Sequence, residues 1–148
     1  MKCLDRPCQK PSLNVASEEM MLSLFRGYRP VFKPHRLGQE VESLLRLGPS
    51  QRMCYYDGKL FGGYVTFLMD RILADCCKHM EKPAFTAYLN TSFLLSIPPT
   101  VPIMLRAWPE KIEGRKIFLK GSVQIPGQSS NEWLDAIQAE SLFIQPRV

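Results

Sequence analysis

The chain contains few histidines, no long apolar run and no dense block of like charge. Its two histidines, His35 and His79, have no sequence context that marks either one as a catalytic base. No run approaches the roughly 20 apolar residues that span a bilayer, so no membrane span is expected. The opening residues, MKCLDRPCQKPSLN, lack the apolar core of a signal peptide. These absences predict a cytoplasmic location.

The excess of positive charge is modest and dispersed. Nineteen Lys and Arg residues face fourteen Asp and Glu residues, which gives a formal net charge of +5. The adjacent aromatic residues Tyr55 and Tyr56 lack an interleaved basic stripe. We therefore expect no nucleic-acid partner, although a modest positive balance suits an anionic small ligand.

The five cysteines form no recognisable disulfide or metal-binding pattern. Cys3 and Cys8 are not spaced like a zinc knuckle, and Cys76-Cys77-Lys78-His79 lacks a second pair of ligands. Free thiols in a reducing compartment are the simplest interpretation, and neither a metal nor another cofactor is expected. Cys54 could act as a nucleophile only with a partner base that the sequence does not supply.

The length of 148 residues and the hydrophobic fraction of 45% fit a single globular domain. Residues 1–40 are expected to form an N-terminal arm, with a short helix from Ser17 to Phe25 that Ser17 caps. Residues 41–148 are expected to form the main domain. Residues 28–33 favour a strand, and residues 40–47 fit either a strand or a helix.

A strong helical pattern begins at Gly62 and continues to about His79. The apolar residues that recur with helical spacing, and should face a core, are Val65, Leu68, Met69, Ile72, Leu73 and Cys76. The charged residues Arg71, Asp75 and Lys78 lie on the opposite flank and are expected to face solvent.

Asp70 belongs to neither group. At about 100° per residue it lies roughly 130° from the centre of the apolar stripe. Its neighbours on the helix surface are all small: Gly63, Thr66, Ala74 and Cys77. Asp70 is therefore either an ordinary surface carboxylate or one that another chain segment approaches closely.

After residue 83 the apolar period changes from 3.6 to 2, which predicts strands. In residues 85–93, one face carries Phe85, Ala87, Leu89, Thr91 and Phe93, and the other carries the polar set Thr86, Tyr88, Asn90 and Ser92. Three more strands are predicted near 101–108, 117–125 and 136–144, with a hairpin turn at Glu113-Gly114-Arg115. A long buried helix followed by four antiparallel strands indicates an α+β fold with the helix packed on the sheet.

The segment Phe61-Gly62-Gly63 at the start of the helix has a chemical use. Two glycines let another group approach the backbone closely, and a helix start offers free N–H groups and a partial positive charge. Such a site could hold a developing oxyanion, with Asp70 as base or nucleophile.

The order of these motifs resembles the hotdog-fold acyl-CoA thioesterases, in the branch of the phenylacetate-pathway and human mitochondrial enzymes. The segments that carry the resemblance are Phe61-Gly62-Gly63, Asp70, Thr86–Phe93, Pro98-Pro99, Glu113–Lys116 and Ala139–Ile144. The resemblance runs from about Leu44 to the C-terminus. It implies an antiparallel sheet wrapped around the central helix, and a homodimer or dimer of dimers whose sheets join edge to edge.

The resemblance also implies roles for individual residues. The N–H of Gly62 would polarise the thioester carbonyl, and Asp70 would act as nucleophile or activate water. Thr86 of the partner chain would position that water. The substrate would be an acyl-CoA or a carrier-bound acyl or polyketide chain. The family has histidine where this chain has Phe61, whose ring can neither donate nor accept a hydrogen bond.

Two other functions remain open for the same fold. In a cyclase, four aromatic residues could line an apolar pocket for a hydrophobic intermediate, although such residues more often pack in a core. They are Phe61, Tyr64, Phe67 and Tyr88. Alternatively, the chain could bind acyl thioesters or a partner protein without turnover. The predicted substrate-binding residues are Phe61, Gly63, Tyr64, Phe67, Tyr88 and Asn90.

Overall fold

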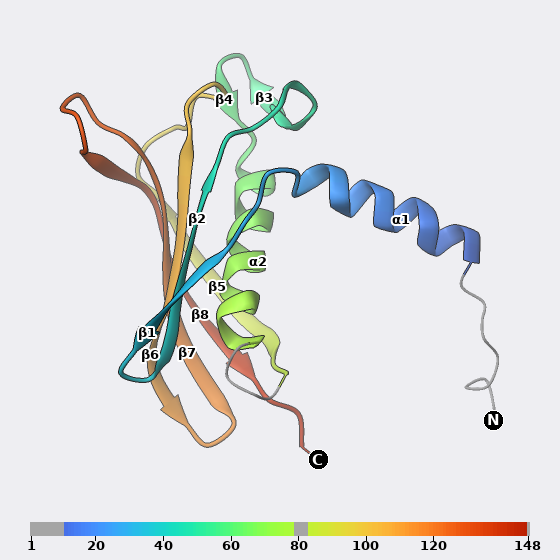
Figure 1. Ribbon diagram of the computed structural model, residues 1–148, viewed down its shortest axis with the longest axis vertical. Coiled ribbons are helices and arrows are strands. Elements are labelled where there is room, and N and C mark those ends of the chain that lie inside the picture. Colours follow the sequence, from blue (N-terminus) through green and yellow to red (C-terminus); the bar gives the residue numbers. More distant parts are fainter. Residues whose placement is uncertain (1–10, 79–82, 148) are drawn as a thin grey trace.

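The computed structural model describes residues 11–78 and 83–147, with side chains described from residue 17 onward. A six-stranded antiparallel sheet lies against one long helix, α2 (Gly62–Lys78), as Figure 1 shows. The sheet has the order β1-β2-β6-β7-β8-β5. The strands are β1 (Val31–His35), β2 (Gly38–Leu45), β5 (Phe85–Phe93), β6 (Ile103–Glu113), β7 (Lys116–Pro126) and β8 (Trp133–Ile144). This arrangement confirms the predicted α+β class.

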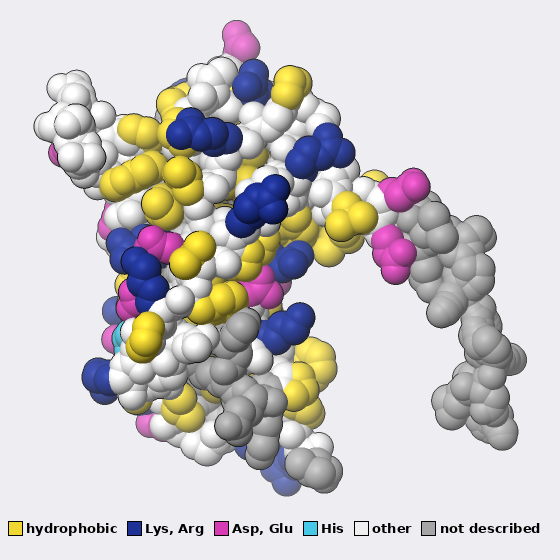
Figure 2. Space-filling model, viewed as in Figure 1, with side chains coloured by type: hydrophobic (Ala, Val, Ile, Leu, Met, Phe, Trp, Pro, Cys, Tyr) yellow, Lys and Arg dark blue, Asp and Glu magenta, His cyan; other side chains and the backbone are white. Residues whose placement is uncertain are grey.

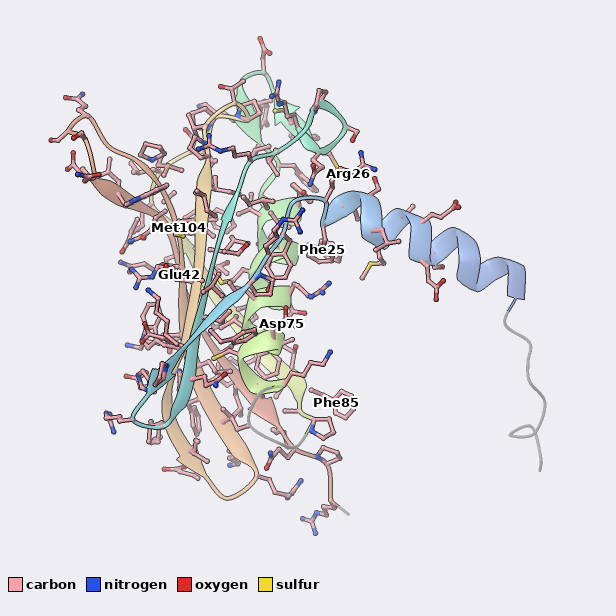
Figure 3. All side chains as sticks on the ribbon, in the orientation of Figure 1. Phe25, Arg26, Glu42, Asp75, Phe85 and Met104 are labelled. Carbon is pink, nitrogen blue, oxygen red and sulfur yellow. The ribbon has the colours of Figure 1, made fainter. Side chains whose placement is uncertain are left out.

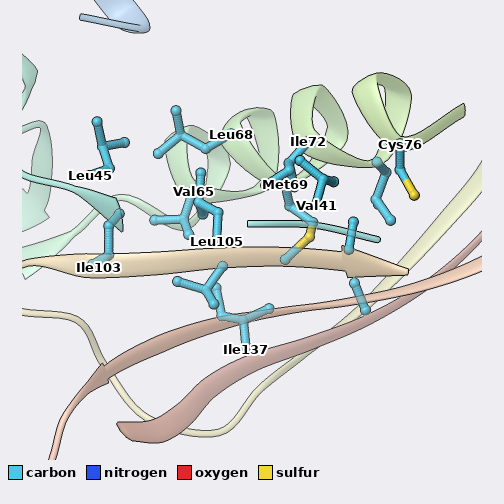
Figure 4. Close-up of a cluster of buried hydrophobic side chains, with 14 of the residues drawn as sticks. Val41, Leu45, Val65, Leu68, Met69, Ile72, Cys76, Ile103, Leu105 and Ile137 are labelled. Carbon is cyan, nitrogen blue, oxygen red and sulfur yellow. The ribbon is translucent and has the colours of Figure 1, made fainter. Parts of the chain in front are cut away.

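The core lies between α2 and the sheet (Figure 4). The predicted apolar stripe of α2 is buried completely, because Leu68, Met69 and Ile72 are each 0% exposed. Helix and sheet approach closely at Gly121 of β7. A Cβ at this position would lie 2.8 Å from Sδ of Met69 and 2.8 Å from the Arg106 carbonyl oxygen. Only glycine leaves enough space for this contact.

The N-terminal part differs from its prediction. The first helix, α1 (Pro11–Leu24), is longer than expected, so Ser17 lies inside it and does not cap it. Figure 1 shows α1 projecting away from the sheet. Residues 40–47, whose pattern fits either a strand or a helix, lie in strand β2 as far as Leu45. Strand β1 pairs with β2. The expected domain boundary after residue 40 therefore falls within a strand of the sheet.

A short segment connects β2 to α2. It contains a turn of 3-10 helix, η2 (Pro49–Gln51), and a two-stranded hairpin of β3 (Cys54–Tyr56) and β4 (Lys59–Leu60). The Gln51 side chain is 1% exposed. Its Nε2 donates to the carbonyl oxygens of Leu24 and Arg26, and this ties the end of α1 to the start of the connecting segment.

The solvent-facing flank predicted for α2 is partly covered. The Tyr28 hydroxyl donates to Oδ2 of Asp75 at 2.6 Å, and Arg71 Nε lies 3.2 Å from the same oxygen. The Arg71 guanidinium in turn stacks 4.6 Å from the centre of the Phe25 ring. Asp75 is therefore only 14% exposed, which corrects its predicted solvent exposure. The cause is the segment between α1 and β1, which crosses this flank of the helix (Figure 3).

Candidate active site

Asp70 lies on the flank of α2 that faces strand β5. The Thr86 hydroxyl donates a hydrogen bond of 2.9 Å to Oδ1 of Asp70. Both side chains keep contact with solvent, because Asp70 is half-buried and Thr86 is exposed. Asp70 belongs to neither the buried nor the charged stripe of the helix because its flank of α2 contacts strand β5.

A β-bulge at the start of β5 turns Thr86 toward the helix. Thr86 pairs with Phe143 of β8, whereas Tyr88 pairs with Leu142, so the register shifts between residues 86 and 88. Phe143 is 1% exposed and faces the core, and paired residues share a face of a sheet. Thr86 therefore lies on the helix face, which corrects the prediction from strict alternation that placed it with Tyr88 and Asn90.

The N-terminus of α2 presents free amide groups. Phe61 precedes the helix, and its carbonyl oxygen accepts from the N–H groups of Tyr64 and Val65 at 3.1 and 3.3 Å. Within the described part of the chain, the N–H groups of Gly62 and Gly63 have no acceptor. These two amides are the groups that a helix start leaves for an external oxygen.

Two phenylalanine rings flank the glycines. A Cβ at Gly62 would lie 3.2 Å from the Phe93 ring, and one at Gly63 would lie 2.7 Å from the Phe61 ring. Phe61 is 48% exposed and Phe93 is 54% exposed, and the Tyr55 ring lies 6.2 Å from that of Phe61. The helix start is thus bordered by half-exposed apolar rings. Neither Phe93 nor Tyr55 was predicted from the sequence, where Phe93 is only one member of an alternating apolar face.

The distance between Gly62 and Asp70 limits how they can act together. They are eight residues apart on one straight helix, which separates their backbone positions by about 12 Å. One chain cannot bring both groups to a single carbonyl carbon. Thr86, by contrast, reaches Asp70 within the same chain. A partner chain is therefore not needed to supply Thr86, contrary to the expectation from the resemblance.

The remaining predicted binding residues do not gather around Asp70. Tyr64 is 4% exposed, and its hydroxyl donates to the Leu24 carbonyl oxygen at 2.7 Å. Burial raises the pKa of this phenol. Phe67 stacks on Phe25 with 4.8 Å between ring centres. Tyr88 and Asn90 lie on the opposite face of the sheet, together with Leu142 and Glu140 of β8. Tyr64 and Phe67 thus pack at the end of α1, whereas Tyr88 lies on the other face of the sheet, so these residues do not line one common pocket.

The buried thiols are not suited to nucleophilic attack. Burial raises the pKa of both Cys76 and Cys77 to about 12, so both thiols stay protonated near neutral pH. Cys54 is exposed on β3. Cys3, Cys8 and His79 lie outside the described residues. Within residues 11–78 and 83–147, no three His, Cys, Asp or Glu side chains are grouped so that they could hold a metal ion, and no helix has the length and apolarity to cross a membrane.

The sequence is similar to that of a rat thioesterase. It is 33% identical to the acyl-coenzyme A thioesterase THEM4 of Rattus norvegicus over 118 residues, which cover 74% of this chain and 49% of the relative. The chain thus spans about half the length of this curated relative. No protein-family model matches the chain.

The fold is shared with solved bacterial thioesterases. One is a hypothetical thioesterase of Streptococcus pneumoniae with coenzyme A, at 15% identity and a TM-score of 0.69, over 82% of this chain and 90% of that one. Another is a variant of the Staphylococcus aureus acyl-CoA hydrolase in complex with coenzyme A. It has 18% identity and a TM-score of 0.65, over 73% of this chain and 65% of that one.

An antiparallel sheet wrapped against one long helix, shared with these thioesterases, is the hotdog fold. The chain therefore has the hotdog fold, and its sequence is similar to about half of the rat thioesterase.

Proposed function

We propose that this protein hydrolyses an acyl thioester, either an acyl-CoA or a carrier-bound acyl chain of lipid or polyketide metabolism. The observation that carries the proposal is the 2.9 Å hydrogen bond from Thr86 to Asp70. It joins a carboxylate on the helix flank to a hydroxyl that a β-bulge turns toward it.

This pair is suited to activating water. Thr86 donates its proton to Oδ1 of Asp70, so its lone pairs can accept a hydrogen bond from a water molecule. The second carboxylate oxygen of Asp70 can take the proton of that water as it attacks the thioester carbonyl. Direct attack by the carboxylate on the carbonyl is the alternative route. In both routes the carbonyl oxygen becomes an oxyanion, which the free N–H of Gly62 stabilises. Collapse of this intermediate breaks the C–S bond and releases the thiolate, which in the water route takes back the proton from Asp70 and leaves as the thiol. In the direct route the product is a mixed anhydride on Asp70, which water then hydrolyses to the acid and the free carboxylate.

The 12 Å separation along α2 requires that Gly62 and Asp70 of one site come from two copies of the chain. Strand β5 is an edge of the sheet, and such edges are usually covered. It is rich in exposed apolar side chains, and Phe85 is 65% exposed and Phe93 is 54% exposed. We propose a homodimer in which the β5 edges of two copies pair antiparallel.

Antiparallel pairing of these edges would assemble the site. Thr86 at one end of β5 contacts Asp70, and Phe93 at the other end packs against Gly62. Antiparallel pairing of two β5 strands places the N-terminal end of one copy beside the C-terminal end of the other. The Asp70–Thr86 pair of one copy would therefore face the Gly62 amide of its partner, at two equivalent sites per dimer.

The relatives support this chemistry. The rat protein is an acyl-coenzyme A thioesterase, and the Streptococcus pneumoniae protein was solved with coenzyme A. Solved variants of the latter replace an aspartate and a threonine by alanine. These two residues have the same separation in the sequence as Asp70 and Thr86, which are 16 residues apart.

The proposal is tested by thiol release from a panel of acyl-CoA substrates. The wild type should release thiol from at least one of them, and Asp70→Asn, which keeps the size of the side chain, should lose most of that rate. Asp57→Asn, in the exposed β3–β4 turn, is the matched control and should keep it. Equal rates for the wild type and Asp70→Asn would refute the mechanism. A wild type that binds acyl-CoA without turnover would favour the non-catalytic scaffold.

A further inference from the structure

A hollow of about 600 Å³ lies on the face of the sheet that points away from α2. Its lining comes from all six strands of the sheet. In Figure 3, Glu42 lies on this side of the sheet, opposite the side where Asp75 marks α2. The volume is within the range of about 300–1,000 Å³ that is typical of small-molecule sites. The Asp70–Thr86 pair lies on the other face and does not contribute to the hollow.

The centre of the hollow is a row of polar side chains held in register by the sheet. Arg106 of β6 pairs with Ser122 of β7, which pairs with Gln138 of β8. Ser122 is only 4% exposed. It lines the hollow, and within the described part of the chain its hydroxyl has no hydrogen-bond partner. The Ser122 hydroxyl can therefore donate a hydrogen bond to a ligand in the hollow.

Arg106 has no ion-pair partner among the described residues, whereas its acidic neighbours are already engaged. Glu42, which is opposite Arg106 in the strand pairing, lies 3.3 Å from Lys33 Nζ. Asp135 accepts hydrogen bonds from Gln124 at 2.8 Å and from Gln138 at 3.0 Å. The Arg106 guanidinium and the Ser122 hydroxyl at the centre of the hollow are therefore not paired with a carboxylate of the described residues.

The other two acidic residues of the lining stand opposite lysines. Glu40 pairs with Lys33 across β1 and β2, and Glu140 pairs with Lys120 across β7 and β8. Lys33 and Lys120 form their ion pairs with Glu42 and Glu110, respectively, and both lysines also line the hollow. The centre, by contrast, contains a cation and a hydroxyl, which together recognise a carboxylate or a phosphate.

An aromatic ring lies beside this anion-recognising centre. Trp108 follows Arg106 by two residues on β6, and both line the hollow. Their backbone positions are thus about 7 Å apart on the same face of the strand. The Trp108 ring offers a flat apolar surface at a short distance from the charged centre.

We propose that this hollow binds a small organic anion with a flat ring. The carboxylate or phosphate of the ligand pairs with Arg106 and Ser122, and its ring packs on Trp108. The site lies on the opposite face of the sheet from Asp70, so occupancy does not depend on thioester hydrolysis.

Calorimetric titration with benzoate and with phenyl phosphate tests the proposal and distinguishes the two anions. The purified wild type should bind at least one probe saturably. Arg106→Gln should weaken binding at least tenfold, since a hydrogen bond to a charged group is lost. Ser122→Ala should weaken it by a smaller factor. Arg115→Gln, in the β6–β7 turn, and Asp70→Asn should bind like the wild type.

Several outcomes would overturn the proposal. Absence of saturable binding by either probe would do so, as would equal affinity of the wild type and both hollow variants. Loss of binding in Asp70→Asn would assign the probes to the catalytic site. Inorganic phosphate that binds as tightly as phenyl phosphate would remove the role of Trp108. Circular dichroism identifies a variant that fails to fold, and Ser122→Ala then remains as an independent test.

Discussion

The Gly62 amide can be tested separately from the side chain that any substitution adds. Gly62 is the first residue of α2, a position where proline is well tolerated because the N–H has no partner within the helix. Gly62→Pro removes this N–H. Gly62→Ala keeps it and adds only a Cβ, so the pair of variants separates the donor from the steric effect.

The structure gives the expected size of each effect. A Cβ at Gly62 would lie 3.2 Å from the Phe93 ring, so that ring must shift by a few tenths of an ångström. Phe93 is 54% exposed and has room to move, so Gly62→Ala should keep most of the activity. Loss of one oxyanion donor typically costs about 100- to 1,000-fold in kcat, and Gly62→Pro should lose that much.

The assay is the rate of thiol release at saturating acyl-CoA, measured with circular dichroism as a check on folding. Retention of activity by Gly62→Pro would refute the role of the amide. Equal and large losses in both variants would show that space at the helix start, and not the N–H, limits catalysis.

Three further changes test other parts of the structure. Thr86→Val removes the hydroxyl that contacts Asp70, and kcat should fall about 10- to 100-fold if it positions the attacking water. Tyr28→Phe removes the 2.6 Å hydrogen bond to Asp75, and urea unfolding should show a loss of about 1–2 kcal/mol. Burial raises the thiol pKa of Cys76 and Cys77 to about 12. The unfolded chain then loses these protons at lower pH than the folded chain, so the free energy of unfolding should fall as pH rises from about 9 to 12.

Each of these changes has a matched control. Thr91→Val alters a threonine of β5 that pairs with Ala139, five residues from Thr86, and should keep kcat. Tyr88→Phe removes the hydroxyl of an exposed tyrosine and should not alter stability. Replacing both buried cysteines by alanine should reduce the alkaline loss of stability. If the free energy of unfolding of that double variant fell with rising pH as steeply as in the wild type, the thiol explanation would be contradicted.

The central helix α2 could be predicted from the sequence alone because the spacing of its apolar residues is a local pattern. The helical spacing of apolar residues from Val65 to Cys76 depends only on the helix itself, and α2 buries them as predicted. The alternation in 85–93 likewise predicted strand β5. The short apolar pattern of residues 40–47 fits both a strand and a helix, and the pairing of β2 with β6 makes these residues a strand up to Leu45.

The geometry of the candidate site could not be predicted from spacing alone. The β-bulge that turns Thr86 toward the helix arises from the register between β5 and β8, and sequence periodicity assumes that no residue is extra. The contact of Asp75 with Tyr28 joins residues 47 positions apart. Similarly, the position of Phe93 beside Gly62 depends on the packing of β5 on α2. Such contacts follow from tertiary structure, which local patterns do not encode.

The central claim is that each catalytic site combines Gly62 of one chain with Asp70 and Thr86 of another. Co-purified mixed dimers of Asp70→Asn and Gly62→Pro chains, with a different affinity tag on each, test it most directly. Shared sites predict one intact and one doubly defective site per mixed dimer, and thus about half of the wild-type rate from two inactive parents. A mixed dimer as inactive as its parents would contradict the account.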